Sequence, residues 1–203
     1  MKKYFELLNK NINMLNKKFI ESIKKDYLKK NSDRRQIISL SNIVLNNSKK
    51  AIFAIHRKDI KIASEKLSES DNIINKIFKN FGTNRPLEEG SFMAALEEYA
   101  EAKLFFNFAT TKKIDKIKEI KLPVESYIGG MCDFTGELVR LAINEIIDKN
   151  LSAIKPIKDT INEVLNELID FDITGYLRTK YDQARGNLKK IEQIDYEINL
   201  KKL

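Results

Sequence analysis

Two pairs of carboxylates, each spaced by about one helical turn, are the strongest candidates in this chain for a catalytic or metal-binding site. Glu98 and Glu101 lie three positions apart, and Asp133 and Glu137 lie four positions apart. On an α-helix, residues at these spacings share one face. Four carboxylates brought together would repel one another unless a divalent cation lay between them. The two pairs therefore predict a magnesium-type site.

The first pair is surrounded by apolar residues. On a helical projection, the sector around Glu98 and Glu101 holds only alanine and phenylalanine: Ala94, Ala95, Ala102, Phe105, Phe106 and Phe108. An ionised carboxylate in such a sector costs on the order of several kcal/mol unless it is compensated. The compensation is a raised pKa, a Lys or Arg partner, or a metal ion. Glu97 projects to the edge of the sector, and we interpret it as a bystander.

The second pair lies on the polar side of a segment that holds three glycines: Gly129, Gly130 and Gly136. A glycine inside a helix costs about 1 kcal/mol relative to alanine. Three of them indicate a face that a neighbouring helix or a ligand backbone approaches closely. A structural alternative for this pair is that Glu137 forms an ion pair with Arg140 while Asp133 is solvated.

The donor atoms available favour a hard cation over zinc. Carboxylate oxygens suit Mg²⁺ or Mn²⁺, and the chain has one histidine, His56, and one cysteine, Cys132. We interpret His56 as a residue at a helix C-terminus and Cys132 as a packed thiol. The sequence contains neither a Walker loop nor a GxGxxG motif.

The composition of the chain limits which binding partners and which cellular compartment are plausible. The net charge of +8 favours a polyanionic partner, RNA or DNA first, although many Lys-rich proteins bind no nucleic acid. No run of apolar residues is long enough to span a membrane, and the N-terminus does not resemble a secretory signal. A single cysteine excludes a disulfide within the chain. We therefore expect a cytoplasmic protein without a membrane partner.

Apolar periodicity predicts seven helices in one all-α domain spanning residues 1–203. Glycine and proline are scarce, at 7 and 3, which favours long helices. Polar residues at Asn31-Ser32-Asp33 predict a break and an N-cap between the first two helices. A Lys-rich connection is expected at 112–122. The seven predicted helices cover residues 3–29, 31–57, 59–81, 88–111, 123–148, 153–170 and 174–198.

The first and last predicted helices carry apolar stripes with coiled-coil-like spacing. Packing within the chain explains such stripes most simply. The alternative is that part of the last helix packs against another subunit.

Five segments resemble the family of translin and translin-associated factor X (Trax). The most specific is YIGGMCDFTGELVR at 127–140, and EYAEA at 98–102 is similar to the acidic helix of Trax. The resemblance covers about residues 30–200. The other similar segments are DRRQIISLS at 33–41, SKKAIFAIHR at 48–57 and LRTKYDQARGNLKKIE at 177–192.

The resemblance implies a seven-helix fold that assembles into a hollow, barrel-like octamer. In Trax, acidic residues form the centre of a Mg²⁺-dependent endoribonuclease that acts on single-stranded RNA inside the barrel. Those positions fall on Glu98, Glu101, Asp133 and Glu137. Translin lacks the full set, whereas this chain has all four carboxylates, so it resembles Trax more than translin. Similarity to prokaryotic members implies a homo-oligomer.

The sequence thus predicts an endoribonuclease that uses Mg²⁺ or Mn²⁺ to hydrolyse single-stranded RNA. Arg140 would contact phosphate or anchor Glu137. Arg34 and Arg35 would guide RNA. The alternative is that they are only solvent-exposed basic residues at the start of a helix. The main alternative is a non-catalytic, translin-type oligomer that binds single-stranded RNA or DNA. A helical scaffold without nucleic acid is a third interpretation.

Overall fold

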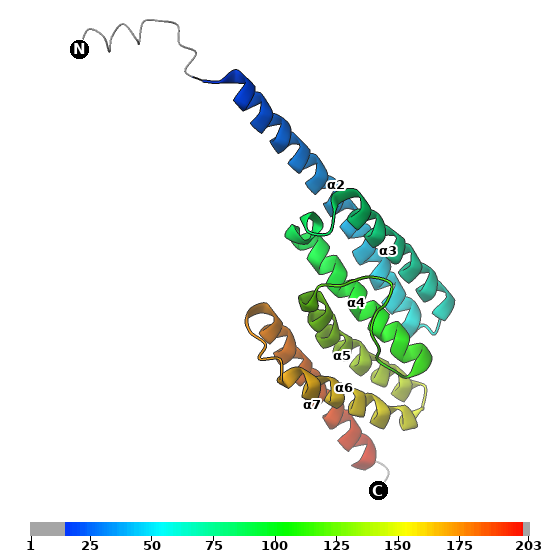
Figure 1. Ribbon diagram of the computed structural model, residues 1–203. Coiled ribbons are helices and arrows are strands. Elements are labelled where there is room, and N and C mark those ends of the chain that lie inside the picture. Colours follow the sequence, from blue (N-terminus) through cyan, green and yellow to red (C-terminus); the bar gives the residue numbers. More distant parts are fainter. Residues whose placement is uncertain (1–14, 201–203) are drawn as a thin grey trace, which may run out of the picture. The chain divides into compact units, whose positions relative to one another are not determined.

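The computed structural model describes residues 15–200 of the chain, and this part contains six α-helices and the segments that connect them (Figure 1). This part contains no β-strand, so the all-α prediction is confirmed. None of its helices is both long and apolar enough to cross a membrane. Short 3₁₀ turns lie at Arg85–Glu88 and Leu151–Ala153. The helices are α2 (Lys17–His56), α3 (Ile60–Phe81), α4 (Gly90–Thr111), α5 (Val124–Ile147), α6 (Ile154–Ile169) and α7 (Gly175–Leu200).

The predicted break at Asn31-Ser32-Asp33 is wrong, because α2 is one continuous helix from Lys17 to His56. The stretch contains neither glycine nor proline, so nothing forces the backbone out of the helical conformation. The three polar residues offer a cap, but the helix continues through them. The predicted start of the first helix, at residue 3, lies outside the described residues.

The chain divides into two compact units between Gln36 and Ile37. The second unit holds residues 37–56 of α2 and the five other helices. The single domain that we predicted for residues 1–203 therefore stays a prediction. In the first unit, the following large apolar side chains are exposed: Leu15, Phe19, Ile20, Ile23, Tyr27 and Leu28.

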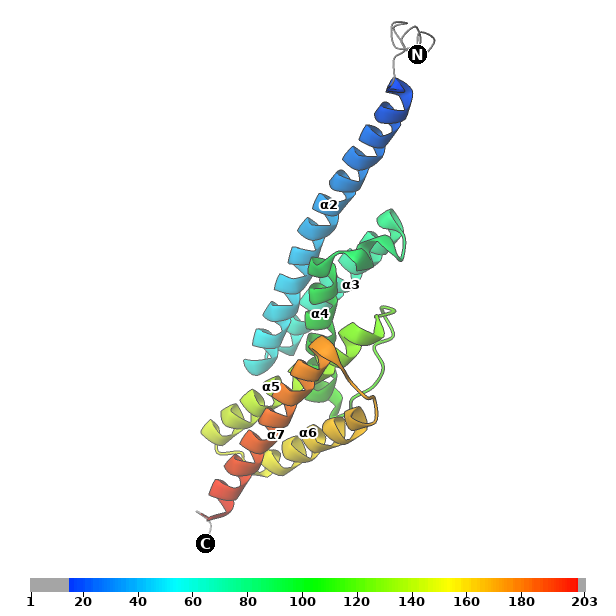
Figure 2. The ribbon, with the colours of Figure 1, turned by 90° about the vertical axis from the view of Figure 1, so that its left-hand side faces the viewer.

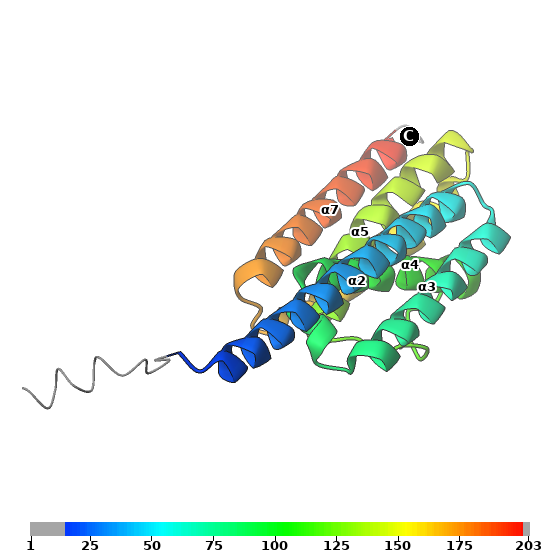
Figure 3. The ribbon, with the colours of Figure 1, turned by 90° about the horizontal axis from the view of Figure 1, so that it is seen from above.

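In the second unit, α4 packs between α3 and α5, and α5 also contacts α6 and α7. Figure 2 shows α7 crossing in front of α5 and α6. The C-terminal part of α2, drawn in cyan, lies between α3 and α5 in Figure 3. Side-chain contacts agree with this view: Asn47 of α2 donates to Glu69 of α3, and His56 of α2 bonds to Glu137 of α5.

Helix α4 is the most enclosed element of the second unit. Its apolar residues are spread around nearly the whole circumference, so neighbouring helices can cover every side. This enclosure carries the acidic residues of α4 into the interior of the fold. The buried positions of α4 are Phe92, Ala95, Leu96, Tyr99, Ala100, Glu101, Ala102, Lys103, Leu104, Phe105 and Phe108.

The glycines of α5 permit a close approach to α4. A Cβ atom added to Gly130 would lie 2.6 Å from Ala100 Cβ and 2.9 Å from the backbone nitrogen of Glu101. One added to Gly129 would lie 2.2 Å from Glu97 Oε2. At Gly130 the contacts are with the α4 backbone and Ala100, so a side chain would force the two helices apart, whereas at Gly129 the flexible Glu97 side chain would have to move aside. The predicted close approach is thus confirmed, and the approaching element is α4.

Candidate functional site

Four carboxylates from α4 and α5 interact across the seam between these two helices. We call Glu98, Glu101, Asp133 and Glu137 the carboxylate cluster. Burial and the negative charges of the three other members raise the pKa of Glu101 to about 9. Burial also raises the pKa of Glu98, assisted by Asp133 and Glu137 and opposed by Lys49. The cluster therefore concentrates negative charge within a largely apolar environment.

Glu101 lies deepest in the cluster, with a relative exposure of 8%. It forms no hydrogen bond and no ion pair with any residue between 15 and 200. A buried carboxyl group without a partner is stable only if it binds a proton or a cation. Glu101 is therefore a position in the second unit where a bound cation would remove a large cost of burial.

Asp133 is bonded to a lysine that reaches the cluster from α7. Lys180 Nζ lies 2.5 Å from Asp133 Oδ2 and 2.9 Å from Glu97 Oε1, and the Tyr176 hydroxyl donates to Glu97 at 2.7 Å. Burial opposes the charge on Lys180, but the bonds to Asp133 and Glu97 outweigh it and raise the lysine's pKa. Burial raises the pKa of Asp133, while Lys180 opposes that shift. The lysine thus joins α4, α5 and α7 at one edge of the cluster.

Glu137 is bonded at the other edge to the last residue of α2. The His56 Nε2 atom hydrogen-bonds Glu137 Oε2, and the Asn144 amide lies 3.3 Å from His56 Nδ1. If Asn144 donates to Nδ1, the ring proton is on Nε2 and points at the carboxylate. The ring also packs on Phe105 at a centroid distance of 4.8 Å. His56 therefore holds Glu137 in one orientation.

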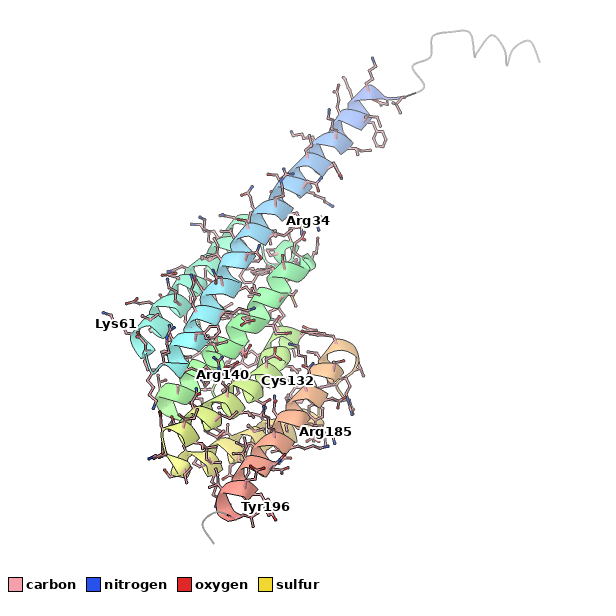
Figure 4. All side chains as sticks on the ribbon, turned by 180° about the vertical axis from the view of Figure 1, so that it is seen from behind. Arg34, Lys61, Cys132, Arg140, Arg185 and Tyr196 are labelled. Carbon is pink, nitrogen blue, oxygen red and sulfur yellow. The ribbon has the colours of Figure 1, made fainter. Side chains whose placement is uncertain are left out.

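Two further cations lie on the outer side of the cluster. Arg140 Nη1 is 3.6 Å from Glu137 Oε2, which agrees with the ion pair considered from the sequence. Lys49 Nζ of α2 is 4.0 Å from Glu98 Oε2. The Arg140 guanidinium also lies 4.9 Å from the centre of the Phe53 ring. Figure 4 labels Arg140 on α5, beside α2.

As the side chains lie, no three Asp, Glu, His or Cys residues within 15–200 are gathered closely enough to hold one metal ion. Asp133 and Glu137 bond instead to Lys180 and His56. Binding of one ion by the whole cluster would need Glu98 and Glu101 to come closer to the second oxygens of Asp133 and Glu137, which Lys180 and His56 do not bond. The set of oxygen donors nevertheless fits a hard cation such as Mg²⁺.

Sequence reasoning missed three members of this site. His56 does end α2, as predicted, but its bond to Glu137 depends on the tertiary structure. Glu97, which we interpreted as a bystander, binds Lys180 and Tyr176. The only signal for Lys180 was its membership of a family-like segment. Cys132 is a buried free cysteine, as predicted.

Arg34 and Arg35 lie in the first unit, where both side chains are exposed. The carboxylate cluster lies in the second unit. The role in RNA guidance that we assigned to these two arginines stays a prediction.

Sequence comparison relates most of the chain to one protein family. The family model of the Translin family matches residues 32–202. An uncharacterized protein of Methanocaldococcus jannaschii is 29% identical over 166 residues, which cover 79% of this chain and 74% of that protein. Human translin is 27% identical over 116 residues, or 54% of this chain and 51% of translin. The match thus spans about half the length of the translin sequence.

Solved structures show the same fold. The crystal structure of apo-NeC3PO superposes with a TM-score of 0.80 at 22% identity and covers 87% of this chain and 95% of its own. The structure of AfC3PO in complex with duplex RNA superposes with a TM-score of 0.79 at 18% identity and covers 89% of this chain and 96% of its own.

Proposed function

This chain belongs to the translin family, and we propose that it is an RNA-binding oligomer that hydrolyses RNA with the help of Mg²⁺ or Mn²⁺. Single-stranded RNA is the proposed substrate. The carboxylate cluster is the proposed catalytic centre. The observation that carries this proposal is the burial of Glu101, without a partner, among three other carboxylates.

The chemistry of the cluster supports a hard divalent cation. Its four side chains offer only oxygen donors, and they repel one another in the absence of a counterion. We propose that Glu98, Glu101, Asp133 and Glu137 hold the ion. When bound, it would lower the pKa of a water molecule and stabilise charge on the phosphate that is cleaved.

The surrounding residues would prepare the cluster for this role. His56 fixes one oxygen of Glu137, and Lys180 fixes one oxygen of Asp133, so neither carboxylate rotates freely. Arg140 keeps its guanidinium beside Glu137 at the outer side of the cluster, where a phosphate group could approach. This proposed hydrolysis needs no side chain as a nucleophile.

Charge and family both support RNA as the ligand. The chain has a net charge of +8, and Lys49 and Arg140 lie next to the cluster. The related AfC3PO was solved with duplex RNA. A test of substrate preference should therefore compare duplex RNA with single-stranded RNA.

Exposed apolar side chains support the proposed homo-oligomer. Leu15, Phe19 and Ile23 recur at four-residue intervals in the first unit, and each is about half exposed or more. Another subunit would remove such a stripe from water. Eight subunits is the number we propose, and light scattering on the intact protein measures it.

The main alternative is an oligomer that binds RNA without cutting it. One observation favours it: Asp133 and Glu137 already have bonded partners in Lys180 and His56, as members of a structural network would. In that case the cluster stabilises the contacts among α2, α5 and α7, and bound RNA stays intact.

Cleavage separates the two proposals. Purified protein is incubated with end-labelled single-stranded RNA in Mg²⁺, in Mn²⁺ and in a chelator. The endoribonuclease proposal expects internal cleavage with either ion and none with the chelator. Binding without cleavage under all three conditions would favour the non-catalytic oligomer.

A further inference from the structure

A phenylalanine is exposed beside the carboxylate cluster. Phe53 lies on the outer face of α2 in the second unit, three residues before His56, and is 50% exposed. Its neighbours Ile52 and Ala54 are buried, so the sequence places one aromatic ring outward between two core residues. Neither the core of the second unit nor the proposed chemistry at the carboxylate cluster uses this ring.

The ring of Phe53 is connected to the cluster through an arginine. The Arg140 guanidinium lies over the ring, 4.9 Å from its centre, and the same side chain is 3.6 Å from Glu137 Oε2. Arginine and aromatic planes attract each other in this arrangement. The pair therefore places an aromatic ring with one face against a cation, and with half of its surface exposed, directly next to a proposed catalytic carboxylate.

Positive charge surrounds this surface along α2. Lys49 lies four residues before Phe53 on the same face of α2. Arg57 directly follows the end of α2, and its backbone N–H still bonds the Phe53 carbonyl oxygen at 3.3 Å, so its exposed side chain starts close to the ring. Lys49 also reaches to 4.0 Å from Glu98 Oε2. An apolar protein partner would not need cations on both sides of a single ring. An aromatic ring between cations suits a nucleic acid strand, because bases stack while phosphates need countercharge.

We propose that Phe53 and Arg140 form a stacking platform for one unpaired RNA base, with Lys49 and Arg57 next to the flanking phosphates. The platform would place the backbone of a single strand beside Glu98 and Glu137. A duplex keeps its bases paired and stacked inside, so it cannot use the ring. This inference rests on the proposed RNA-binding function and adds the element that selects single strands.

The test measures RNA binding in a chelator, so that no cleavage contributes. The probe is a single-stranded oligoribonucleotide that contains 2-aminopurine, and a duplex of the same sequence serves for comparison. Phe53→Leu removes the ring and keeps an apolar side chain, whereas Phe53→Trp keeps a ring. Tyr196→Leu is the matched control, because Tyr196 is an exposed aromatic residue near the end of α7 (Figure 4).

We expect Phe53→Leu to weaken single-strand binding about tenfold, within the range measured for one stacked base. Duplex binding should not change. Phe53→Trp should retain affinity and quench 2-aminopurine fluorescence, and Tyr196→Leu should bind like the unmodified protein.

Equal single-strand affinity in Phe53→Leu and the unmodified protein would overturn the platform and leave the proposed RNA hydrolysis standing. An equal loss in Tyr196→Leu, or an equal loss for duplex, would also overturn it. Absence of RNA binding by the unmodified protein would overturn both proposals. A Phe53→Leu variant that changes only the oligomer size in light scattering would assign the ring to a subunit contact instead.

Discussion

His56 and Glu137 are hydrogen-bonded although 81 positions separate them in the chain. The bond joins the C-terminal end of α2 to the middle of α5. Asn144, two turns further along α5, contacts the other nitrogen of the same ring at 3.3 Å. The only histidine of the chain is therefore held at both nitrogens and directed at one carboxylate of the cluster.

Removing this histidine should impair the cluster more than the fold. We expect His56→Leu to reduce metal affinity and RNA cleavage about 10- to 100-fold, because Glu137 loses the group that orients it. His56→Gln keeps an N–H donor and should retain more of both. Mn²⁺ titration and single-turnover cleavage measure the two effects. Equal behaviour of the Leu and Gln variants would argue against an orienting hydrogen bond.

The raised pKa of Glu101 predicts how stability varies with pH. In the absence of divalent ions, the folded protein keeps a proton on Glu101 up to a pKa of about 9, whereas the unfolded chain loses it near 4.5. The folded state thus binds more protons between these values, and the free energy of unfolding falls as pH rises through this window. The total loss is on the order of a few kcal/mol.

Glu101→Gln should flatten this dependence, since the amide does not titrate. Urea unfolding at pH values from 5 to 9 measures it for both proteins. A parallel pH dependence in the two would show that other groups cause the loss.

A divalent cation should stabilise the folded protein by an amount that rises with the logarithm of its concentration relative to the dissociation constant. At about 100 times the dissociation constant, one site adds roughly 2.7 kcal/mol to the free energy of unfolding. We expect Mn²⁺ or Mg²⁺ to raise the melting temperature of the unmodified protein at pH 8. Glu101→Gln should respond much less, whereas Glu163→Gln, at an exposed position on α6, should respond normally. An identical rise in all three proteins would place the ion elsewhere.

Gly130→Ala should destabilise the protein by about 1–3 kcal/mol, as overpacking does. Its Cβ would lie 2.6 Å from Ala100 Cβ and 2.9 Å from the Glu101 nitrogen, so α4 and α5 must separate next to Glu101. The rate of RNA cleavage by this variant should also fall, because the separation displaces Glu101 from the carboxylates of α5.

Gly186→Ala is the matched control for that substitution. It lies inside α7 with no atom within 4 Å of the added Cβ. It should be neutral or stabilise the protein by up to about 1 kcal/mol. Thermal unfolding of both variants tests the pair, and a harmless Gly130→Ala would contradict the close approach of the two helices.

The sequence predicted those features that depend on local pattern. The acidic pairs on α4 and α5 follow from helical spacing, and the glycines of α5 indicated a close approach that α4 provides. The continuity of α2 was missed, because Asn31-Ser32-Asp33 permits a cap without requiring one. The partners of the carboxylates were missed for a different reason. Lys180 and His56 reach them from helices far away in the chain, and no local pattern encodes that packing.

RNA cleavage by the Glu101→Gln variant decides whether the carboxylate cluster is the catalytic centre. The substitution keeps the size of the side chain and removes the charge at the buried centre of the cluster. Cleavage and binding of the same labelled single-stranded RNA are measured in Mg²⁺, with Glu163→Gln as the control and the oligomer size checked by light scattering.

We predict that Glu101→Gln loses at least about 100-fold in cleavage rate, since the metal carries the chemistry. Its affinity for RNA should remain within about threefold, because Lys and Arg contacts to phosphate supply the binding. The control should match the unmodified protein in both measurements. Full cleavage activity in Glu101→Gln, with the oligomer intact, would contradict the assignment of the carboxylate cluster as the catalytic centre.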